Sequence, residues 1–383
     1  MSNPSVRRFV LRNPFAGDSP IVTTLAAITA LLTMFGLFMV LSASSVTSGL
    51  QHNGNFYAEA WTQTTIAIAG SGLALFVARV PLTFWQAGRN SFVLLGVALQ
   101  SAVLLFGESY GGNKNWITIF GVSIQPSEFL KLAIIVWFAS WIHDNEHLID
   151  APMAYWREAA IWVGIPLLLV MFGQDLGTTV ILGMILLGMM AFAGVPSRTL
   201  WSLIGLGLGA ALIMVNLGGS GRGARFATWI QGCTPADYET VCWQTIHGLW
   251  ALSAGGLFGV GPGSSRAKWS WLPHADSDYI FAIVGEELGM LGAIALIALF
   301  LALAVTLIRL IRQFPQPLTR VLIGGVFVWI IGQAFVNIAV VLNLLPVLGV
   351  PLPFISSGGS ALLAILLAIG VLISCVRHEE RYG

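Results

Sequence analysis

The residues that lead up to Asp278 form the richest group of chemically active side chains in the sequence. Arg266 and Lys268 stand beside two tryptophans, and Asp278 directly precedes an apolar run that begins at Tyr279. Paired cations among tryptophans suit an anionic headgroup at a membrane surface. A carboxylate at the edge of an apolar run is partly desolvated, which raises its pKa and suits it to act as a general base near neutral pH. A solvated loop with an N-capping aspartate is the competing interpretation, but the combination favours a site.

Three further charged residues stand beside or within apolar segments, where such residues are functional candidates by default. Glu128 and Lys131, in QPSEFLK, are three residues apart and share a helix face. A structural ion pair is the better interpretation of these two on residue grounds alone. Asp175, in GQDLGTT, is sufficiently explained as a helix cap, with a polar cavity as the alternative.

Two adjacent glutamates, Glu286 and Glu287, follow YIFAIVG inside an apolar segment. Neighbouring residues on a helix point in directions that differ by about 100°. At least one of the two must therefore face the interior of the bundle. A salt bridge or a backbone hydrogen bond explains them as well as catalysis does.

The segment PVLGVPLPFISSGGSALLA, which contains Ser356 and Ser357, concentrates Pro, Gly and Ser between two apolar runs. Backbone groups exposed by such a break need partners, so we expect this segment to line a cavity rather than to face lipid.

Cys233 and Cys242 lie in the longest loop, and Cys375 lies near the other end of the chain. A disulfide between the first two would close a short loop, worth about 3 kcal/mol at most by chain entropy. We favour the disulfide over two free thiols, because the loop is expected on the oxidising side of the membrane. No cluster of Cys and His has the spacing of a zinc site.

The composition excludes most classes of protein. Of 383 residues, 56% are hydrophobic and only 9% are charged, where soluble domains carry about 25% charged residues. A mean hydropathy of +0.83 is too high for one water-soluble core of this size. The solvent must therefore be lipid, and a net charge of +1 without a basic run excludes nucleic acid as a partner.

Ten apolar segments follow one another at short intervals along the chain. At about 20 residues per membrane-spanning helix, they predict an all-α polytopic membrane protein with about ten transmembrane helices. The segments are 21–41, 61–78, 92–106, 128–141, 159–172, 178–193, 200–217, 279–308, 321–345 and 361–376.

The distribution of Lys and Arg predicts the orientation, because cytoplasmic loops carry an excess of both. With the N-terminus inside, twelve arginines fall on the inner side and five cations on the outer side, while Lys131 lies near a helix start. Both termini are therefore expected in the cytoplasm. The predicted parts are a tail over residues 1–20, a transmembrane domain over 21–376 with a large outer loop over 218–278, and a second tail over 377–383.

Together these segments resemble the SEDS family of shape, elongation, division and sporulation proteins, whose members FtsW and RodA polymerise peptidoglycan. The resemblance extends from MVLSASS near Val40 to SSGGS at Ser360. Gly285, in front of two glutamates, is similar to FtsW more than to RodA, where alanine is usual. The matching pieces are GGNKNWITIFGVSIQPSEFLKLA, GQDLGTT, HGLWALSAGGLFGVGPGSSRAKWSWLP, SDYIFAIVGEELG and QAFVNIAVVLNLLPVLGVPLPFISSGGS.

The resemblance implies a ten-helix fold and processive glycosyl transfer on lipid II, the undecaprenyl-pyrophosphate disaccharide-pentapeptide. The family's essential acidic residue, in a motif like LPEAHTDFIF, falls on Asp278. Its other motif positions fall on Glu128, Lys131 and Asp175. The sequence departs from the family pattern at His274 and Asp276, where Glu and His are usual, at Lys114 and Asn115, where two arginines are usual, and at Gln174, where proline is usual.

The mechanism that we expect is an inverting transfer in which Asp278 takes the proton of the acceptor hydroxyl. Cations such as Lys114, Arg266 and Lys268, or a divalent ion (Mg²⁺ or Mn²⁺), would stabilise the leaving pyrophosphate. Further candidates for contacts with the pyrophosphate or the sugars are Glu128, Lys131, Asp175, Ser356 and Ser357.

The resemblance also implies partners and a location. The expected partners are a class B penicillin-binding protein transpeptidase and other membrane proteins of the divisome. The expected location is the bacterial inner membrane at the division septum. Two other functions stay open: a transporter of lipid-linked precursors, because broken helices and intramembrane charges also fit alternating access, and a non-catalytic scaffold for a transpeptidase.

Overall fold

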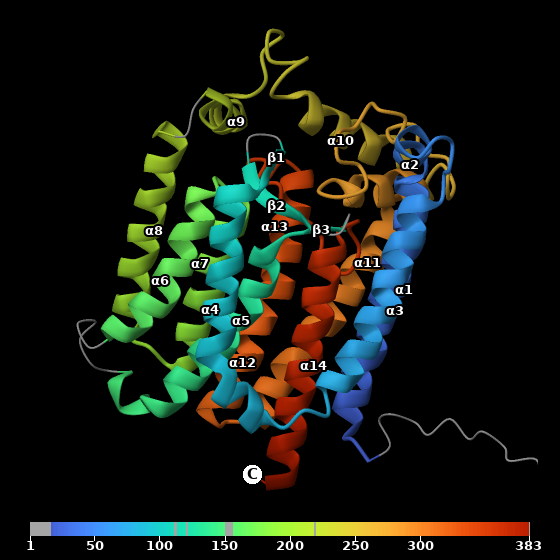
Figure 1. Ribbon diagram of the computed structural model, residues 1–383. Coiled ribbons are helices and arrows are strands. Elements are labelled where there is room, and N and C mark those ends of the chain that lie inside the picture. The colour runs from blue at the N-terminus through green and yellow to red at the C-terminus, as the bar shows by residue number, and fades with distance from the viewer. Residues whose placement is uncertain (1–16, 111–112, 120–121, 150–155, 218–219, 383) are drawn as a thin grey trace, which may run out of the picture.

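The computed structural model describes residues 17–110, 113–119, 122–149, 156–217 and 220–382. Its long helices run side by side along one direction (Figure 1). The helices are α1 (Pro20–Ala43), α2 (Ser45–Gln51), α3 (Ala58–Val77), α4 (Leu82–Phe106), α5 (Pro126–Asp144), α6 (Arg157–Phe172), α7 (Leu176–Ala193), α8 (Ser197–Leu217), α9 (Ser220–Gln231), α10 (Trp243–Gly255), α11 (Ile280–Gln313), α12 (Pro317–Phe327), α13 (Gln333–Val341) and α14 (Gly359–Tyr382).

The prediction of a helical membrane protein is confirmed. Nine of the ten predicted apolar segments lie on single helices to within a residue, and the segment 321–345 runs through α12 and α13. Seven of the described helical segments are long and apolar enough to cross a membrane. The predicted segments outside these seven lie on α5, α6 and α8. Helix α6 has only 16 residues, and the apolar part of α8 covers Ser197–Ile213. The count of ten spans stays a prediction.

The two ends of the described chain lie at the same end of the bundle. Figure 1 shows the start of α1 and the C-terminal end of α14 at the bottom, and α2, α9, α10 and the strands at the top. This arrangement agrees with an even number of crossings. We refer to the end that carries α9 and α10 as the outer end, in keeping with the predicted orientation.

Helix α11 is broken at Gly289, whose φ of 69° and ψ of −170° are not helical. The freed backbone groups are bonded by the loop that follows α10. Val260 N donates to Glu286 O at 2.9 Å, and Met290 N donates to Gly256 O at 2.9 Å. A break in a membrane helix is stable only where neighbouring protein provides such partners, so this loop and α11 form one unit.

A small antiparallel sheet, which the sequence analysis did not predict, covers part of the outer end. Strand β1 (Glu108–Tyr110) pairs with β2 (Asn113–Ile119), which pairs with β3 (Val122–Ile124). The sheet is tied to the end of α6 by a hydrogen bond from Lys114 N to Gly173 O. Strands of three to seven residues leave too short an alternation of polar and apolar residues for a clear signal.

Helices α12 and α13 join through one π-helical turn, Val328–Gly332. Such turns are frequent at functional sites. Here the turn is followed by Gln333, whose side-chain amide donates from Nε2 to Pro351 O at 2.9 Å. The π-helical region therefore contacts the loop between α13 and α14.

Candidate active site

Asp278 lies in a tight turn of residues 274–279, immediately before α11 begins at Ile280. Ser277 N and Tyr279 N both donate to His274 O, at 3.2 and 3.1 Å. His274 itself has a φ of 55°, in the left-handed region that histidine adopts more readily than most side chains. The turn therefore fixes the direction in which the side chain of Asp278 projects from the backbone.

The loop between α13 and α14 binds this turn from the side. Ser357 N donates to Asp276 O at 2.8 Å, and Ser356 Oγ donates to Ser277 O at 2.6 Å. The Ser356 hydroxyl also accepts a hydrogen bond from Leu352 N at 2.7 Å. Ser356 and Ser357, predicted as substrate contacts, thus bond the backbone that leads to Asp278.

Asn337 on α13 also binds the turn, through the backbone carbonyl of Asp278. Its Nδ2 donates to Asp278 O and to Val350 O, both at 2.7 Å. The carboxylate of Asp278 lies against Gly349, where an added Cβ would be 3.5 Å from Oδ2. Gly349 has a φ of 68°, a backbone conformation that glycine adopts without strain.

The charge on Asp278 is set by burial and by four charged or titratable neighbours. The side chain is half-buried, and burial, the largest influence, raises its pKa above the usual value; Asp276 and Asp175 raise it further. His274 and Arg225 act in the opposite direction. Among the described residues, no hydrogen-bond donor contacts the carboxylate, so it is available to a substrate hydroxyl.

Asp175 caps the start of α7, as the sequence suggested. Its Oδ1 accepts from Thr178 N at 2.9 Å and its Oδ2 accepts from Gln125 Nε2 at 3.4 Å. The side chain is only 5% exposed. The cap accounts for its position, while its charge still acts on Asp278.

Lys114 binds the end of a helix rather than projecting into open space. Its Nζ donates to Leu104 O at 2.7 Å and to Leu105 O at 3.4 Å. These are carbonyls of the last turn of α4, where a cation complements the helix dipole.

Lys268 is buried in an ion pair. Its Nζ lies 3.1 Å from Glu287 Oε1 and donates to Gly263 O at 2.8 Å. Glu287 also accepts from Ser42 Oγ at 2.7 Å, so α1, the loop and α11 meet at one carboxylate. The salt bridge that was one of the interpretations of this glutamate is therefore present.

Glu286, the neighbour of Glu287, accepts hydrogen bonds from the backbone of the same loop. Arg266 N donates to Glu286 Oε1 at 2.9 Å, and Ser265 Oγ donates to Oε2. The side chain of Arg266 is exposed and has no hydrogen bond or ion pair to the described residues.

Arg225, on α9, is a cation near Asp278 that the sequence analysis did not single out. Its side chain is exposed and forms no ion pair with the described part of the chain, yet its charge favours the ionised forms of both Asp278 and Tyr279. It lines a pocket with Thr245 and Asn343. In the sequence, Arg225 was distinguished only as one of the five cations predicted on the outer side of the membrane.

The pair of Glu128 and Lys131 lies inside the bundle. Lys131 Nζ is 2.7 Å from Glu128 Oε1, and both side chains are at most 2% exposed. Lys131 also donates to Gln333 Oε1 at 3.1 Å and lies 4.9 Å from the ring centre of Trp329. The pair is therefore buried and bonded within the bundle, and its predicted contact with the substrate stays a prediction.

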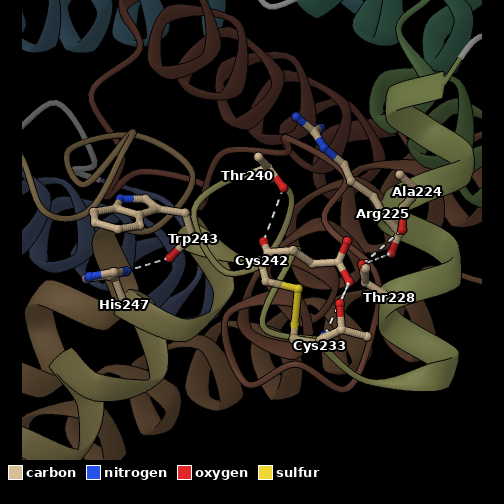
Figure 2. The surroundings of a disulfide bond; sticks show 10 residues. Ala224, Arg225, Thr228, Cys233, Thr240, Cys242, Trp243 and His247 are labelled. Atoms are coloured by element: carbon tan, nitrogen blue, oxygen red, sulfur yellow. Dashed lines mark hydrogen bonds between the residues drawn. A yellow bond between two sulfur atoms is a disulfide. The ribbon is translucent and has the colours of Figure 1, made fainter.

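Cys233 and Cys242 form a disulfide between the end of α9 and the start of α10, with Cα atoms 6.1 Å apart (Figure 2). The bond lines the same pocket as Arg225, whose side chain extends away from it in Figure 2. His247 donates from Nδ1 to Trp243 O at 2.8 Å. The aromatic packing around His247 fixes the other side of the loop.

The residues that the structure describes do not bring three His, Cys, Asp or Glu side chains together as a metal site.

The fold and the site define a polytopic membrane protein with a half-buried carboxylate at the outer end of its bundle. A family model described as "Cell cycle protein", which covers FtsW, RodA and SpoVE, matches residues 22–381. The chain belongs to this family, as the motifs indicated.

Curated relatives match over most of the chain. It is 36% identical to the probable peptidoglycan glycosyltransferase FtsW of Mycobacterium tuberculosis, over 92% of this chain and 67% of that protein. It is 33% identical to the stage V sporulation protein E of Bacillus subtilis, over 93% and 97% of the two chains.

Solved structures share the fold. The rod shape determining protein RodA of Thermus thermophilus superposes with a TM-score of 0.68 at 21% identity, over 94% of this chain and 97% of that chain. A chain of a peptidoglycan synthase complex that coordinates polymerization and crosslinking superposes with a TM-score of 0.73 at 22% identity, with the same coverage.

Proposed function

We propose that this protein is a peptidoglycan glycosyltransferase that polymerises lipid II and releases undecaprenyl pyrophosphate. The observation that carries the proposal is the half-buried carboxylate of Asp278, which is open to a substrate and lies on a turn whose backbone carbonyls accept three hydrogen bonds. Relatives at 30–36% identity that are named as peptidoglycan glycosyltransferases support it.

In this mechanism Asp278 takes the proton from the 4-hydroxyl of the acceptor GlcNAc. The oxygen attacks the anomeric carbon of the donor MurNAc, a new C1–O4 bond forms, and the bond from C1 to the pyrophosphate oxygen breaks with inversion. Because pyrophosphate is a good leaving group, no strong general acid is needed. The proton stays on Asp278 until it passes to solvent.

The leaving pyrophosphate needs positive charge, and we assign this role to Arg225. Lys114 and Lys268, two of the three cations expected from the sequence, are engaged with a helix end and with Glu287. Arg225 has an exposed guanidinium close enough to influence Asp278. A guanidinium can bind phosphate oxygens in a bidentate manner.

The outer location of Asp278 also fits a partner that crosslinks the new strands. We propose a class B penicillin-binding protein transpeptidase, with other membrane proteins of the divisome, at the division septum of the inner membrane. A structural neighbour that belongs to a peptidoglycan synthase complex supports this assembly.

The test is strand synthesis from lipid II by the purified protein, with and without the transpeptidase. Glycan strands from the wild type, and none from Asp278→Asn, are expected. An absence of strands in both conditions would overturn the proposal, and movement of lipid II across a vesicle bilayer would then indicate a transporter. The same assay with a chelator tests the divalent cation that the sequence analysis considered.

A further inference from the structure

We propose that an aromatic cluster at the outer end of the bundle binds a saccharide, namely the sugar part of the glycan strand that the active site produces. The cluster consists of Tyr238, Trp243, His247, Trp250 and Trp271. The proposal rests on the function proposed above only for the source of the saccharide, because the binding itself needs no catalysis.

The five rings of the cluster form one continuous group. The ring centres of Trp243 and His247 are 4.0 Å apart, and Figure 2 shows the two rings one above the other. Trp271 lies nearly parallel to both, at interplanar angles of 15° and 19° and with ring centres 6.1 and 5.9 Å away. Tyr238 and Trp250 have ring centres 6.1 Å apart, and each also contacts His247, at 6.1 and 5.0 Å.

Hydrogen bonds connect the cluster to the turn of the proposed base. Trp243 Nε1 donates to Trp271 O at 2.8 Å. The next residue, Gln244, donates from Nε2 to Pro273 O at 3.3 Å, and Pro273 directly precedes the 274–279 turn. The cluster is therefore held beside the turn from which a new strand would leave.

Trp250 and Trp271 present their rings to the outside. Trp250 is 54% exposed and Trp271 is 56% exposed, and both are held by the ring contacts described above. A held ring offers a flat apolar face to the C–H side of a pyranose, and little side-chain entropy is lost on binding. The cluster is therefore preformed for a ligand with flat apolar faces.

The polar atoms of the cluster suit a neutral ligand that is rich in hydroxyl groups. The indole N–H groups of Trp250 and Trp271 and the hydroxyl of Tyr238 form no hydrogen bond within the described chain. His247 is 5% exposed, and its Nε2 is buried without a partner among the described residues. Such an acceptor is costly to leave unpaired, and a sugar hydroxyl is the kind of donor that it lacks. The cluster contains no permanent charge that would select an anionic lipid headgroup.

The first test uses the wild-type protein in lipid nanodiscs. The protein is oxidised by hydroxyl radicals with and without a chitin hexamer or lipid-free glycan strands, and peptide mapping follows the tryptophans. The saccharide should protect Trp250 and Trp271 from oxidation. Trp269, which is 62% exposed in the same loop and takes no part in the ring contacts of the cluster, should not be protected. Unchanged oxidation of Trp250 and Trp271, or equal protection of all three tryptophans, would overturn the inference.

The second test measures the binding of lipid-free glycan strands to variants. Trp271→Leu keeps an apolar side chain but removes the ring, and should weaken binding by about tenfold. Trp271→Phe keeps a ring and should recover part of the loss. Trp269→Leu is the matched control and should bind like the wild type, with melting temperatures confirming that each variant is folded. Equal weakening in both leucine variants would indicate a contact with the lipid surface instead and would overturn the inference.

Strand synthesis separates this inference from the proposed function. If the wild type makes no strands but binds the lipid-free saccharide as expected, the proposed function fails and the saccharide site stands. If the wild type makes strands but neither the chitin hexamer nor the lipid-free strands bind, the saccharide site fails and the proposed function stands.

Discussion

Asp278 illustrates a conflict between folding and chemistry at a single residue. Burial disfavours its charge, while the proposed reaction needs that charge. Its position before an apolar run was enough to predict a partly desolvated carboxylate from the sequence. The partners that fix it could not be predicted in the same way, because Asn337 follows Asp278 by 59 residues and Ser356 follows Ser277 by 79 residues.

We expect Asp278→Asn to abolish strand synthesis and to leave the melting temperature equal or higher. The pKa of Asp278 is raised in the folded state, so its ionised form is less favourable there than in the unfolded chain. Above the folded-state pKa this group lowers stability, and a neutral amide removes that cost. Glu239→Gln, an exposed change in the outer loop, is the control. Near-normal synthesis by Asp278→Asn would rule out the base assignment.

The roles of the outer cations also depend on distant partners. Lys268 bonds Ser42 across 226 residues, and no local pattern reveals that contact.

We expect Arg225→Ala to reduce kcat/KM by about one to two orders of magnitude, the range for a charge-assisted contact of roughly 1.5–3 kcal/mol. Arg225→Lys should recover part of the loss, because it keeps the charge without the bidentate geometry.

Steady-state kinetics and the binding of a short polyprenyl pyrophosphate check this prediction together. Arg266→Ala serves for comparison, because its exposed guanidinium was the alternative site for the pyrophosphate. A larger loss in Arg266→Ala than in Arg225→Ala would reverse the assignment.

At the scale of elements, the ion pair on α5 tests whether a buried pair is structural. We expect Glu128→Ala or Lys131→Ala to destabilise the protein by about 3–5 kcal/mol, because each leaves an unmatched buried charge. Strand synthesis by each single variant should decrease together with its melting temperature. The double variant Glu128→Leu with Lys131→Leu should recover the melting temperature and strand synthesis, because the hydrogen bonds of the pair run to each other and to Gln333. A stable double variant without synthesis would instead place the pair on the substrate path.

The link between α9 and α10 gives a second test at this scale. We expect Cys233 and Cys242 to be bridged in protein extracted from the membrane, as mass mapping without reductant would show. Alkylation of both thiols would contradict the bridge. Because the disulfide lines the pocket that holds Arg225, replacing both cysteines by serine should raise KM for lipid II more than it lowers kcat.

Hydropathy predicted the long helices well, because the ten apolar segments are continuous along the chain. The break at Gly289 and the sheet of β1, β2 and β3 were not predicted. The break depends on hydrogen bonds from a loop about 30 residues earlier, such as that from Val260 N to Glu286 O, and glycine alone does not indicate it.

At the scale of the whole molecule, the predicted orientation rests on the excess of arginine on one side. We expect a cysteine at position 55, in the loop between α2 and α3, to react with a membrane-impermeant maleimide in spheroplasts. A cysteine at position 382, at the end of α14, should react only after permeabilisation. Both side chains are exposed, and Cys375 is buried, so the wild type is a suitable background. Labelling of position 382 in intact spheroplasts would refute the orientation.

The hydrogen bonds that hold the 274–279 turn also order events during protein synthesis. A chain leaves the ribosome from its N-terminus, so this turn is made well before Asn337, Ser356 and Ser357. Until those last residues have been translated and inserted, the carbonyls of the turn lack the donors that fix Asp278. A nascent chain, or one that ends before these residues, therefore carries the Asp278 carboxylate but lacks the hydrogen bonds that fix the turn beneath it.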